Sequence, residues 1–179
     1  MQKTYKLKIC GLERDLPIVQ VAPHLGIASF VILGDTELVC HTAPELVKRL
    51  PAVDVIITAE AKGIPLAFEI SRLLNMNYII ARKSVKPYMQ NALTVSVNSI
   101  TTQKDQVLCL DNKDVQAVRG KRVAIIDDVI STGESIRAVE RLINEAGGTV
   151  VARAAILAEG DAAERDDIIY LEKLPLFPK

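Results

Sequence analysis

Cysteine is scarce in this sequence, and neither sign of charge is in excess. The 179 residues contain three cysteines, and since at least one of them must stay unpaired, a disulfide framework is disfavoured and a reducing compartment favoured. Lys plus Arg and Asp plus Glu number 22 each, so no overall field attracts the chain to nucleic acid or to an anionic membrane. We therefore expect a cytoplasmic protein in which any anion binding is local.

Long hydrophobic runs and several nucleotide-binding motifs are also missing. Apolar stretches such as 26–33 are too short to cross a bilayer, and the start, MQKTYKLKIC, lacks the core of a signal peptide. The absence of a Gly-x-Gly-x-x-Gly motif and of a Walker Gly-Lys-Ser/Thr ending disfavours dinucleotide enzymes and nucleoside triphosphatases. His24 and His41 lack metal-ligand spacing. We expect neither a membrane partner nor a zinc site.

Short β-branched runs alternate with helical patterns through the middle of the chain. The expected strands are 53–58, 78–81, 123–126 and 149–157, and the expected helices are 63–74 and 134–146. Such alternation is typical of an α/β protein with a mostly parallel central sheet and helices on both faces. No linker divides the chain, and its length suits a single domain, 1–179.

Other segments do not follow this alternation. Residues 93–99 and 106–110 have the pattern of a β-hairpin with its turn at 101–105, which we interpret as a flexible flap beside the sheet. A helical pattern at 44–50 precedes the core, and the chain ends carry short strand-like runs and prolines. These patterns predict a core of about 44–160 and a small hood built from about 1–43 and 168–179.

Three chemically distinctive loops follow the expected strands, where ligands bind in open parallel sheets. They are Glu60–Gly63, Arg82–Lys86 and Asp127–Ser135. The third loop combines two acids with hydroxyl side chains and Gly133, and it leads into a helix. Backbone N–H groups, hydroxyls and the helix dipole together suit a phosphate. Since this loop has no lysine, the cations must come from elsewhere in the chain.

The segment IIDDVISTGES resembles the phosphoribosyl-pyrophosphate signature of the type I phosphoribosyltransferases. EAKGIPLA, at 60–67, resembles the pyrophosphate loop of the purine enzymes, and ARKSVKP, at 81–87, is similar to their Arg-Lys segment. The resemblance spans about 53–157. It is greatest to the adenine and xanthine phosphoribosyltransferases and to the phosphoribosyltransferase domain of bacterial purine repressors.

The resemblance implies a role for each loop. Asp127 and Asp128 would bind the ribose hydroxyls and, with Arg82, would be catalytic. The 5-phosphate would be bound by Ser131, Thr132, Gly133, Glu134 and Ser135, and the pyrophosphate by Glu60, Ala61, Lys62, Gly63, Arg82, Lys83 and Lys86. Mg²⁺ would be held through the substrate, with water-mediated contacts to Asp127 and Asp128. A homodimer is also implied.

Several alternatives stay open from the sequence. Paired acids after a buried strand also occur in phosphoryl-accepting receiver domains, the cations of 82–86 can be a solvated strand end, and Lys62 can lie in a loop that binds through its backbone alone. We expect transfer of a phosphoribosyl group to a purine, adenine first and xanthine second. The alternative is a non-catalytic regulator that binds phosphoribosyl pyrophosphate, because KGIPLA resembles the repressor domain and 97–105 lacks the loop glutamate of the adenine enzymes.

Overall fold

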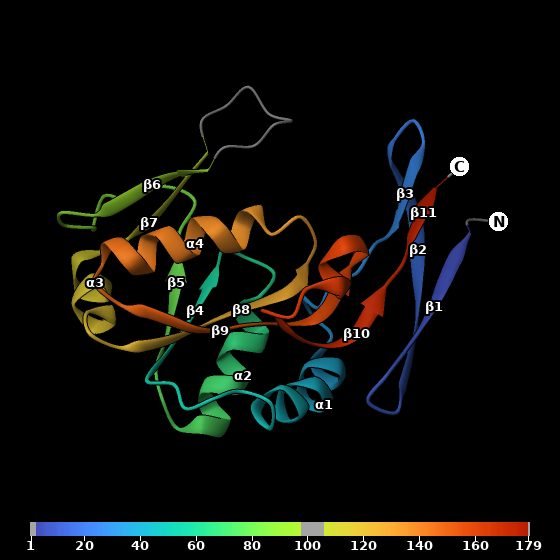
Figure 1. The fold of residues 1–179 in the computed structure, drawn as a ribbon, viewed down its shortest axis with the longest axis horizontal. Helices are drawn as coiled ribbons and strands as arrows, with labels where there is room; N and C mark the ends of the chain where they lie inside the picture. Colours follow the sequence, from blue (N-terminus) through green and yellow to red (C-terminus); the bar gives the residue numbers. More distant parts are fainter. Residues whose placement is uncertain (1–2, 98–105, 179) are drawn as a thin grey trace.

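The computed structural model describes residues 3–97 and 106–178 (Figure 1). The central sheet has the strand order β10-β9-β8-β4-β5, and every pairing in it is parallel. Its strands, in chain order, are β4 (Val55–Ala59), β5 (Tyr78–Ala81), β8 (Arg122–Ile130), β9 (Thr149–Glu159) and β10 (Ile169–Leu174). The mostly parallel sheet expected from the alternation is confirmed.

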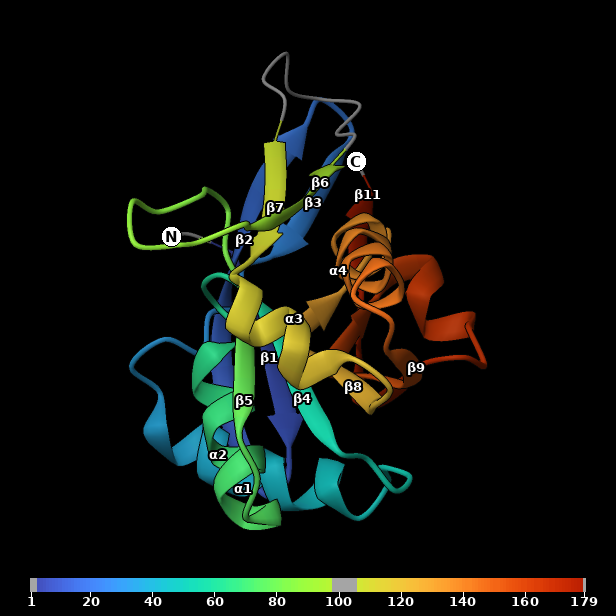
Figure 2. The ribbon, with the colours of Figure 1, turned by 90° about the vertical axis from the view of Figure 1, so that its left-hand side faces the viewer.

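Helices cover both faces of this sheet, as Figures 1 and 2 show. On one face lie α1 (Thr36–Val47) and α2 (Ile64–Leu74), and on the other lies α4 (Glu134–Glu145), with the short α3 (Asn112–Val118) beside it. Neighbouring residues of β4 point to opposite faces, so Ile56 joins the core cluster of α1 and α2 while Ile57 joins that of α4. Because both faces are buried, the inner stretches of the strands are mainly apolar, as in Val123–Ile126 of β8.

Local signals set the helix limits. Pro65 lies in the first turn of α2, and this helix ends at Asn75 in the left-handed conformation. The helix expected over 44–50 is wrong in its bounds, because α1 begins eight residues earlier, at Thr36. The Asp35 side chain caps it there by accepting the Leu38 N–H at 3.1 Å. Pro44 therefore lies inside α1 and does not begin it.

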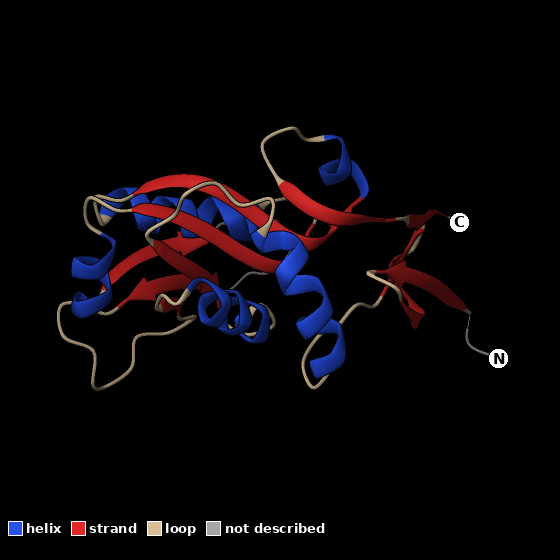
Figure 3. Cartoon of the chain, turned by 90° about the horizontal axis from the view of Figure 1, so that it is seen from below, coloured by secondary structure: helices blue, strands red, loops and turns tan. Residues whose placement is uncertain are grey.

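A second, smaller sheet joins the two ends of the chain (Figures 1 and 3). Its strands are antiparallel in the order β1-β2-β3-β11 and comprise β1 (Thr4–Ile9), β2 (Leu12–Ala22), β3 (Leu25–Ala28) and β11 (Leu176–Pro178). A two-residue turn, Cys10–Gly11, connects β1 to β2 with positive φ at both residues. The hood from the chain ends is thus confirmed. Residues 169–174 pair with β9 in the central sheet, so the C-terminal part of the hood is β11 alone.

The expected hairpin beside the sheet is formed by β6 (Leu93–Val97) and β7 (Gln106–Leu110), which pair antiparallel. Its predicted turn, 101–105, lies outside the described residues. The hairpin is fixed to the core at two places. The Arg141 guanidinium of α4 donates to the Ser96 carbonyl, and Arg82 and Cys109 exchange backbone hydrogen bonds of 2.9 and 2.8 Å. A short 3₁₀ helix, η1 (Gly160–Glu164), follows β9.

Within the described ranges no helix combines the length and the apolar character needed to span a bilayer.

The segment that leads from the hood to α1 supplies a stability test with neighbouring positions. Ile32 is fully buried, whereas Val31 is 51% exposed. Ile32→Ala should lower the free energy of unfolding by about 2–5 kcal/mol, because it leaves a cavity in the core. Val31→Ala should change it by no more than about 0.5 kcal/mol. Urea unfolding followed by circular dichroism measures both, and equal effects would show that Ile32 does not anchor this segment.

Candidate active site

Paired carboxylates lie at the carboxyl edge of the central sheet. Asp127 and Asp128 were expected in the loop after the third strand, but β8 continues through them to Ile130. The reason is that β8 keeps its pairing with β9 along this stretch, with Asp127 opposite Ala155 and Val129 opposite Leu157. A sheet strand therefore holds the acid pair, which limits its freedom to move.

Asp128 is the more deeply buried of the two acids, with only 3% of its side chain exposed. Its Oδ2 lies 3.2 Å from Lys62 Nζ, and this oxygen has no hydrogen bond to any described residue. A buried carboxylate oxygen without a hydrogen bond is costly. Lys62 offsets part of that cost by its charge, and a hydroxyl donor from a ligand would offset more.

Asp127 faces the same edge in a different environment. One of its carboxylate oxygens accepts the N–H of Asp128 at 2.8 Å. Burial, together with the neighbouring Asp128 carboxylate, raises the pKa of Asp127 well above its ordinary range. A donor or a cation brought by a ligand would favour the ionised form, so ligand binding should release a proton here.

Gly63 brings the first loop against the acid pair. A Cβ atom at this position would lie 2.4 Å from Thr58 Oγ1 and 3.3 Å from the Asp127 Cα. No side chain fits there without moving β4 or β8. Gly63 thereby lets the loop Glu60–Gly63 approach Asp127 and brings Lys62 to Asp128.

Glu60 joins the first loop to the second. Its Oε2 accepts the Lys83 N–H at 3.0 Å, and its Oε1 lies 3.3 Å from Arg82 Nε. The hydrogen bond from Lys83, aided by the Arg82 charge, lowers the pKa of Glu60. Glu60 is therefore committed to holding Arg82 and Lys83, while the neighbouring Ala61 is exposed.

Arg82 and Lys86, two cations of the second loop, contact groups other than the acid pair. Arg82 Nη1 is 3.3 Å from the Tyr88 hydroxyl, and both residues line a cleft of about 340 Å³ on the side of Asp111. Lys86 Nζ donates to Ser84 Oγ at 2.7 Å. The structure thus brings Lys62 to the acid pair but shows no contact of Arg82 or Lys86 with it.

The third loop begins the helix α4 and opens onto a small cavity. Gly133 has a φ of +79° and precedes Glu134, the first residue of α4, while Ser131, Thr132 and Ser135 are exposed. The first N–H groups of such a helix have no partner within the helix, so they can bind an anion, although that of Glu134 also donates to Thr132 Oγ1 at 3.4 Å. A cavity of about 260 Å³ lies between this loop, Lys83 and the β6–β7 hairpin. Among the cations of the second loop, Lys83 is the residue that lines this cavity.

Two arginines that the sequence analysis missed flank the same loop. Beside Gly133, the guanidinium groups of Arg137 and Arg165 approach the place where a Cβ would stand. Arg137 belongs to α4, and Arg165 follows η1. No local sequence pattern marks Arg165, because only the packing of η1 on β9 and β10 brings the residue after it to Gly133.

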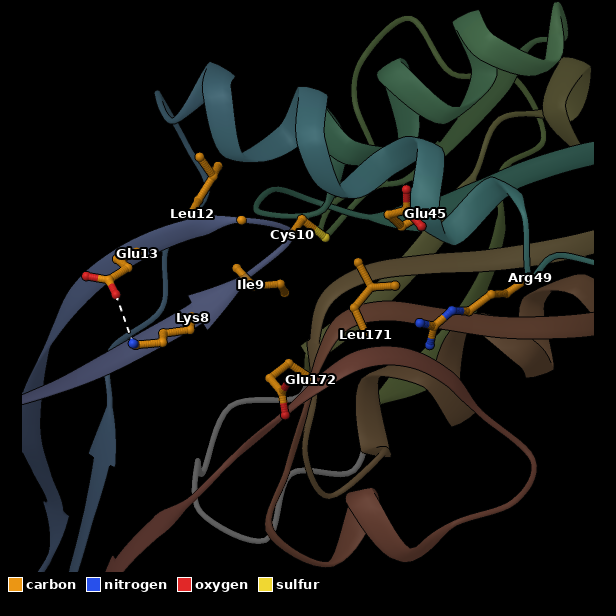
Figure 4. Close-up of a pocket in the computed structure, with 10 residues that line it drawn as sticks. Lys8, Ile9, Cys10, Leu12, Glu13, Glu45, Arg49, Leu171 and Glu172 are labelled. Atoms are coloured by element: carbon orange, nitrogen blue, oxygen red, sulfur yellow. Dashed lines mark ion pairs between the residues drawn. The ribbon is translucent and has the colours of Figure 1, made fainter.

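A separate cleft of about 470 Å³ lies between the turn of β1 and β2, the end of α1 and β10 (Figure 4). Its walls include Cys10, Leu171 and Arg49, whose guanidinium donates to the Tyr170 carbonyl at 2.7 Å. None of the acids, hydroxyls or cations of the three loops lines this cleft. It is distinct from the candidate active site.

Acids and a helix start that meet at the carboxyl edge of a parallel sheet are typical of α/β proteins of the open-sheet class, which bind ligands at this edge. Residues 51–174 match the phosphoribosyl transferase domain, and the chain therefore belongs to the phosphoribosyltransferase family.

Its relatives are purine enzymes by name. A xanthine phosphoribosyltransferase of Chloroflexus aurantiacus is 34% identical over 125 residues, which cover 69% of this chain and 58% of that protein. A hypoxanthine/guanine phosphoribosyltransferase of Methanococcus voltae is 32% identical over 78% of this chain and 71% of its own length. An adenine phosphoribosyltransferase of Clostridium beijerinckii is 29% identical over 90% of this chain and 97% of its own length. The chain thus spans under two thirds of the Chloroflexus protein but nearly all of the Clostridium protein.

Solved structures confirm the type I phosphoribosyltransferase fold. The adenine phosphoribosyltransferase of Thermoanaerobacter pseudethanolicus superposes with a TM-score of 0.72 at 22% identity, covering 88% of this chain and 95% of that one. The Trypanosoma brucei enzyme, solved with AMP, pyrophosphate and ribose-5-phosphate, has a TM-score of 0.64 at 20% identity over 85% of this chain and 72% of its own. The resemblance to the purine branch is confirmed. These relatives, all named as transferases, give no support to a regulator.

Asp127 should produce a pH dependence of stability that its amide variant lacks. The folded protein binds the Asp127 proton more tightly than the unfolded chain, so this carboxyl lowers stability as pH rises from about 4 towards the raised folded-state pKa. The melting midpoint of Asp127→Asn, measured by calorimetry, should therefore rise relative to wild type between about pH 4.5 and about pH 7.5.

Asp54→Asn is the control. The Arg122 guanidinium lowers the pKa of Asp54, so this carboxyl is ionised in both the folded and the unfolded state above about pH 4.5. Its midpoint difference from wild type should be constant over the same range. A constant difference for Asp127→Asn as well would contradict the buried-carboxylate account.

Proposed function

We propose that this chain transfers the phosphoribosyl group of 5-phosphoribosyl 1-pyrophosphate to a purine base, adenine first and xanthine second, giving the nucleoside monophosphate and pyrophosphate. The observation that carries the proposal is the buried Asp128 oxygen, which has no hydrogen bond to any described residue. It lies on the strand β8, and the loop that follows this strand leads to the start of α4 at Gly133. A sugar phosphate has hydroxyl donors and an anionic end, and both features of the edge are complementary to it.

In this proposal the acid pair binds the ribose. Asp127 and Asp128 accept hydrogen bonds from the two ring hydroxyls, and the 5-phosphate lies on the loop Ser131–Ser135. The hydroxyls of Ser131, Thr132 and Ser135 are exposed, as such binding requires. The position of the acids in β8 supports the assignment, because a rigid strand keeps the sugar at a constant distance from the helix start.

The pyrophosphate is assigned to the other two loops. Backbone N–H groups of Ala61, Lys62 and Gly63 bind it, and Arg82, Lys83 and Lys86 neutralise its charge. Glu60 connects these loops through Lys83 and Arg82, so their cations are held as one unit. Lys62 lies beside Asp128 and so close to the ribose end of the leaving group.

Mg²⁺ is the proposed cofactor, and the donor set fits it. Hard carboxylate oxygens suit this ion, and Asp127 and Asp128 provide them at the carboxyl edge of the sheet. These two acids would hold Mg²⁺ through water, together with the substrate, and the ion would neutralise negative charge on the pyrophosphate.

The reaction is a displacement at the anomeric carbon of the ribose. A purine ring nitrogen forms the new carbon–nitrogen bond while the carbon–oxygen bond to pyrophosphate breaks. The electron pair of the broken bond leaves with the pyrophosphate oxygen, and the ring proton that the purine loses passes to the pyrophosphate or to water. The sugar carries positive charge in the transition state, which the nearby carboxylates stabilise, and Arg82 and Lys83 stabilise the departing anion. We keep as a prediction that closure of the region 83–105, of which 98–105 lies outside the described residues, would exclude water that could otherwise attack the sugar.

Adenine is favoured by the adenine phosphoribosyltransferase of Clostridium beijerinckii, which is matched over nearly its whole length. Xanthine comes second on the Chloroflexus relative. We place the base under the mainly apolar segments 19–25 and 171–176, the second of which runs from β10 to the start of β11. We also propose a single domain with core and hood, a homodimer and a location in the cytoplasm. Three free cysteines suit a reducing compartment.

Replacing both acids tests the ribose assignment. Asp127→Asn with Asp128→Asn should lower kcat/KM by at least about a thousandfold, because both acceptors for the sugar hydroxyls lose their charge in the transition state. Asp54→Asn is the matched control, since it neutralises the carboxylate that precedes β4 and pairs with Arg122. The control should retain activity within about twofold. Normal turnover in the double variant would remove the acids from the mechanism.

A panel of four bases tests the substrate. With phosphoribosyl pyrophosphate and Mg²⁺, adenine should have the highest kcat/KM, because a buried mismatch of hydrogen-bonding groups costs about 1–3 kcal/mol, or roughly 5–150-fold, for the other bases. Nucleotide formation followed by chromatography measures this. Guanine as the best substrate would refute the placement of the base under the apolar hood. Binding of phosphoribosyl pyrophosphate without turnover of any base would support the regulator instead.

A further inference from the structure

The loop Ser131–Ser135 contains Gly133, and the guanidinium group of Arg165 lies beside this glycine. If Gly133 had a Cβ, that atom would lie 2.6 Å from Arg165 Nη1 and 3.6 Å from Arg137 Nη1. Gly133 is buried although the hydroxyl residues beside it are exposed. The guanidinium of Arg165 thus occupies the space that any other residue at 133 would need.

Arg165 is itself held in place. Its Nε and Nη2 donate to the two carboxylate oxygens of Asp167 at 2.8 and 2.7 Å, which is the fork geometry that arginine favours. Its backbone N–H donates to the Ala162 carbonyl of η1 at 3.2 Å. Because the paired nitrogens face Asp167, Nη1 is the nitrogen left to face Gly133.

The left-handed conformation of Gly133 needs such support. Glycine visits many backbone conformations, so an unsupported loop would lose entropy when it binds phosphate. A fixed guanidinium against the Cα restricts the glycine before the ligand arrives, and a restrained loop binds with a smaller entropic cost. Its positive charge also adds to the field at the start of α4.

We propose that Arg165 is a positioning residue for the 5-phosphate site: through its contact with Gly133 it holds the loop Ser131–Ser135 in the conformation that binds phosphate. This inference rests on the proposed function, which assigns the 5-phosphate to that loop. Arg165 acts on the loop and not on the reacting atoms, so its removal weakens the binding of the phosphate end and leaves the base unaffected.

Arg165→Met tests the inference, with Arg122→Met as the matched control. Like Arg165, Arg122 donates through Nε and Nη2 to both carboxylate oxygens of one aspartate, Asp54, at 3.1 and 2.9 Å, but it begins β8, at the opposite end of that strand from the acid pair. Arg165→Met should raise the KM for phosphoribosyl pyrophosphate and the Kd of ribose 5-phosphate about tenfold, that is by about 1.4 kcal/mol. It should leave kcat and the KM for the base within about twofold. Arg122→Met should match wild type in all four quantities.

Arg165→Lys separates positioning from charge. Lysine keeps the positive charge but cannot bind Asp167 through a fork and still face Gly133. We expect Arg165→Lys to remain at least about fivefold weaker than wild type for ribose 5-phosphate. Full recovery by lysine would overturn the positioning role, as would a fall in kcat or in melting midpoint that accounts for the loss.

A double-mutant cycle with Gly133→Ala tests the contact directly. The added Cβ meets Arg165 Nη1 in the wild-type background, so Gly133→Ala should cost more ribose 5-phosphate affinity there than in the Arg165→Met background. Equal losses in both backgrounds would mean that the two residues do not interact, and the inference would fail. Failure of wild-type protein to bind ribose 5-phosphate would instead refute the proposed function, so the two failures are distinguishable.

Discussion

The cost of burying Asp128 is the constraint on which the rest of the site depends. A carboxylate with 3% of its side chain exposed needs a counter-charge, and Lys62 provides it at 3.2 Å. That contact requires the first loop to lie against β8, which in turn requires a glycine at position 63. The raised pKa of Asp127 has the same origin, because two acids share one strand end with one nearby lysine. Burying these two acids therefore lowers the stability of the protein without a ligand, as is expected where a ligand supplies the missing partners.

Two glycines fulfil opposite needs at this edge. At Gly63 the missing side chain lets two core strands and a loop approach one another. Gly133 instead leaves room for a guanidinium that comes from a distant segment and adopts a φ that other residues rarely accept. In both cases the backbone is brought close to charged groups. Gly63 thus decides where the charge of Lys62 lies, and Gly133 decides where that of Arg165 lies.

Much of the fold could be predicted from the sequence because its signals are local. The strands 78–81 and 106–110 have the expected bounds, and α2 begins beside Pro65 as its position in the first turn indicates. The start of α1 was missed because the cap at Asp35 lies nine residues ahead of the pattern that indicated a helix. Residues 169–174 were expected in the hood, yet they pair with β9, because neighbours in a sheet are chosen by packing.

By itself the sequence determined the alternation of strands and helices, the family motifs, and the order in which acids, hydroxyls and cations appear along the chain. These features depend on short stretches, so period, turn residues and spacing reveal them. The tertiary structure alone decided that Lys62 meets Asp128, that Glu60 holds Arg82 and Lys83, and that Arg165 faces Gly133. Each of these contacts joins residues from different elements. The sequence around a charged residue does not indicate which distant residue it will contact. Their positions follow from how β4, β8 and η1 pack, which is a property of the whole chain.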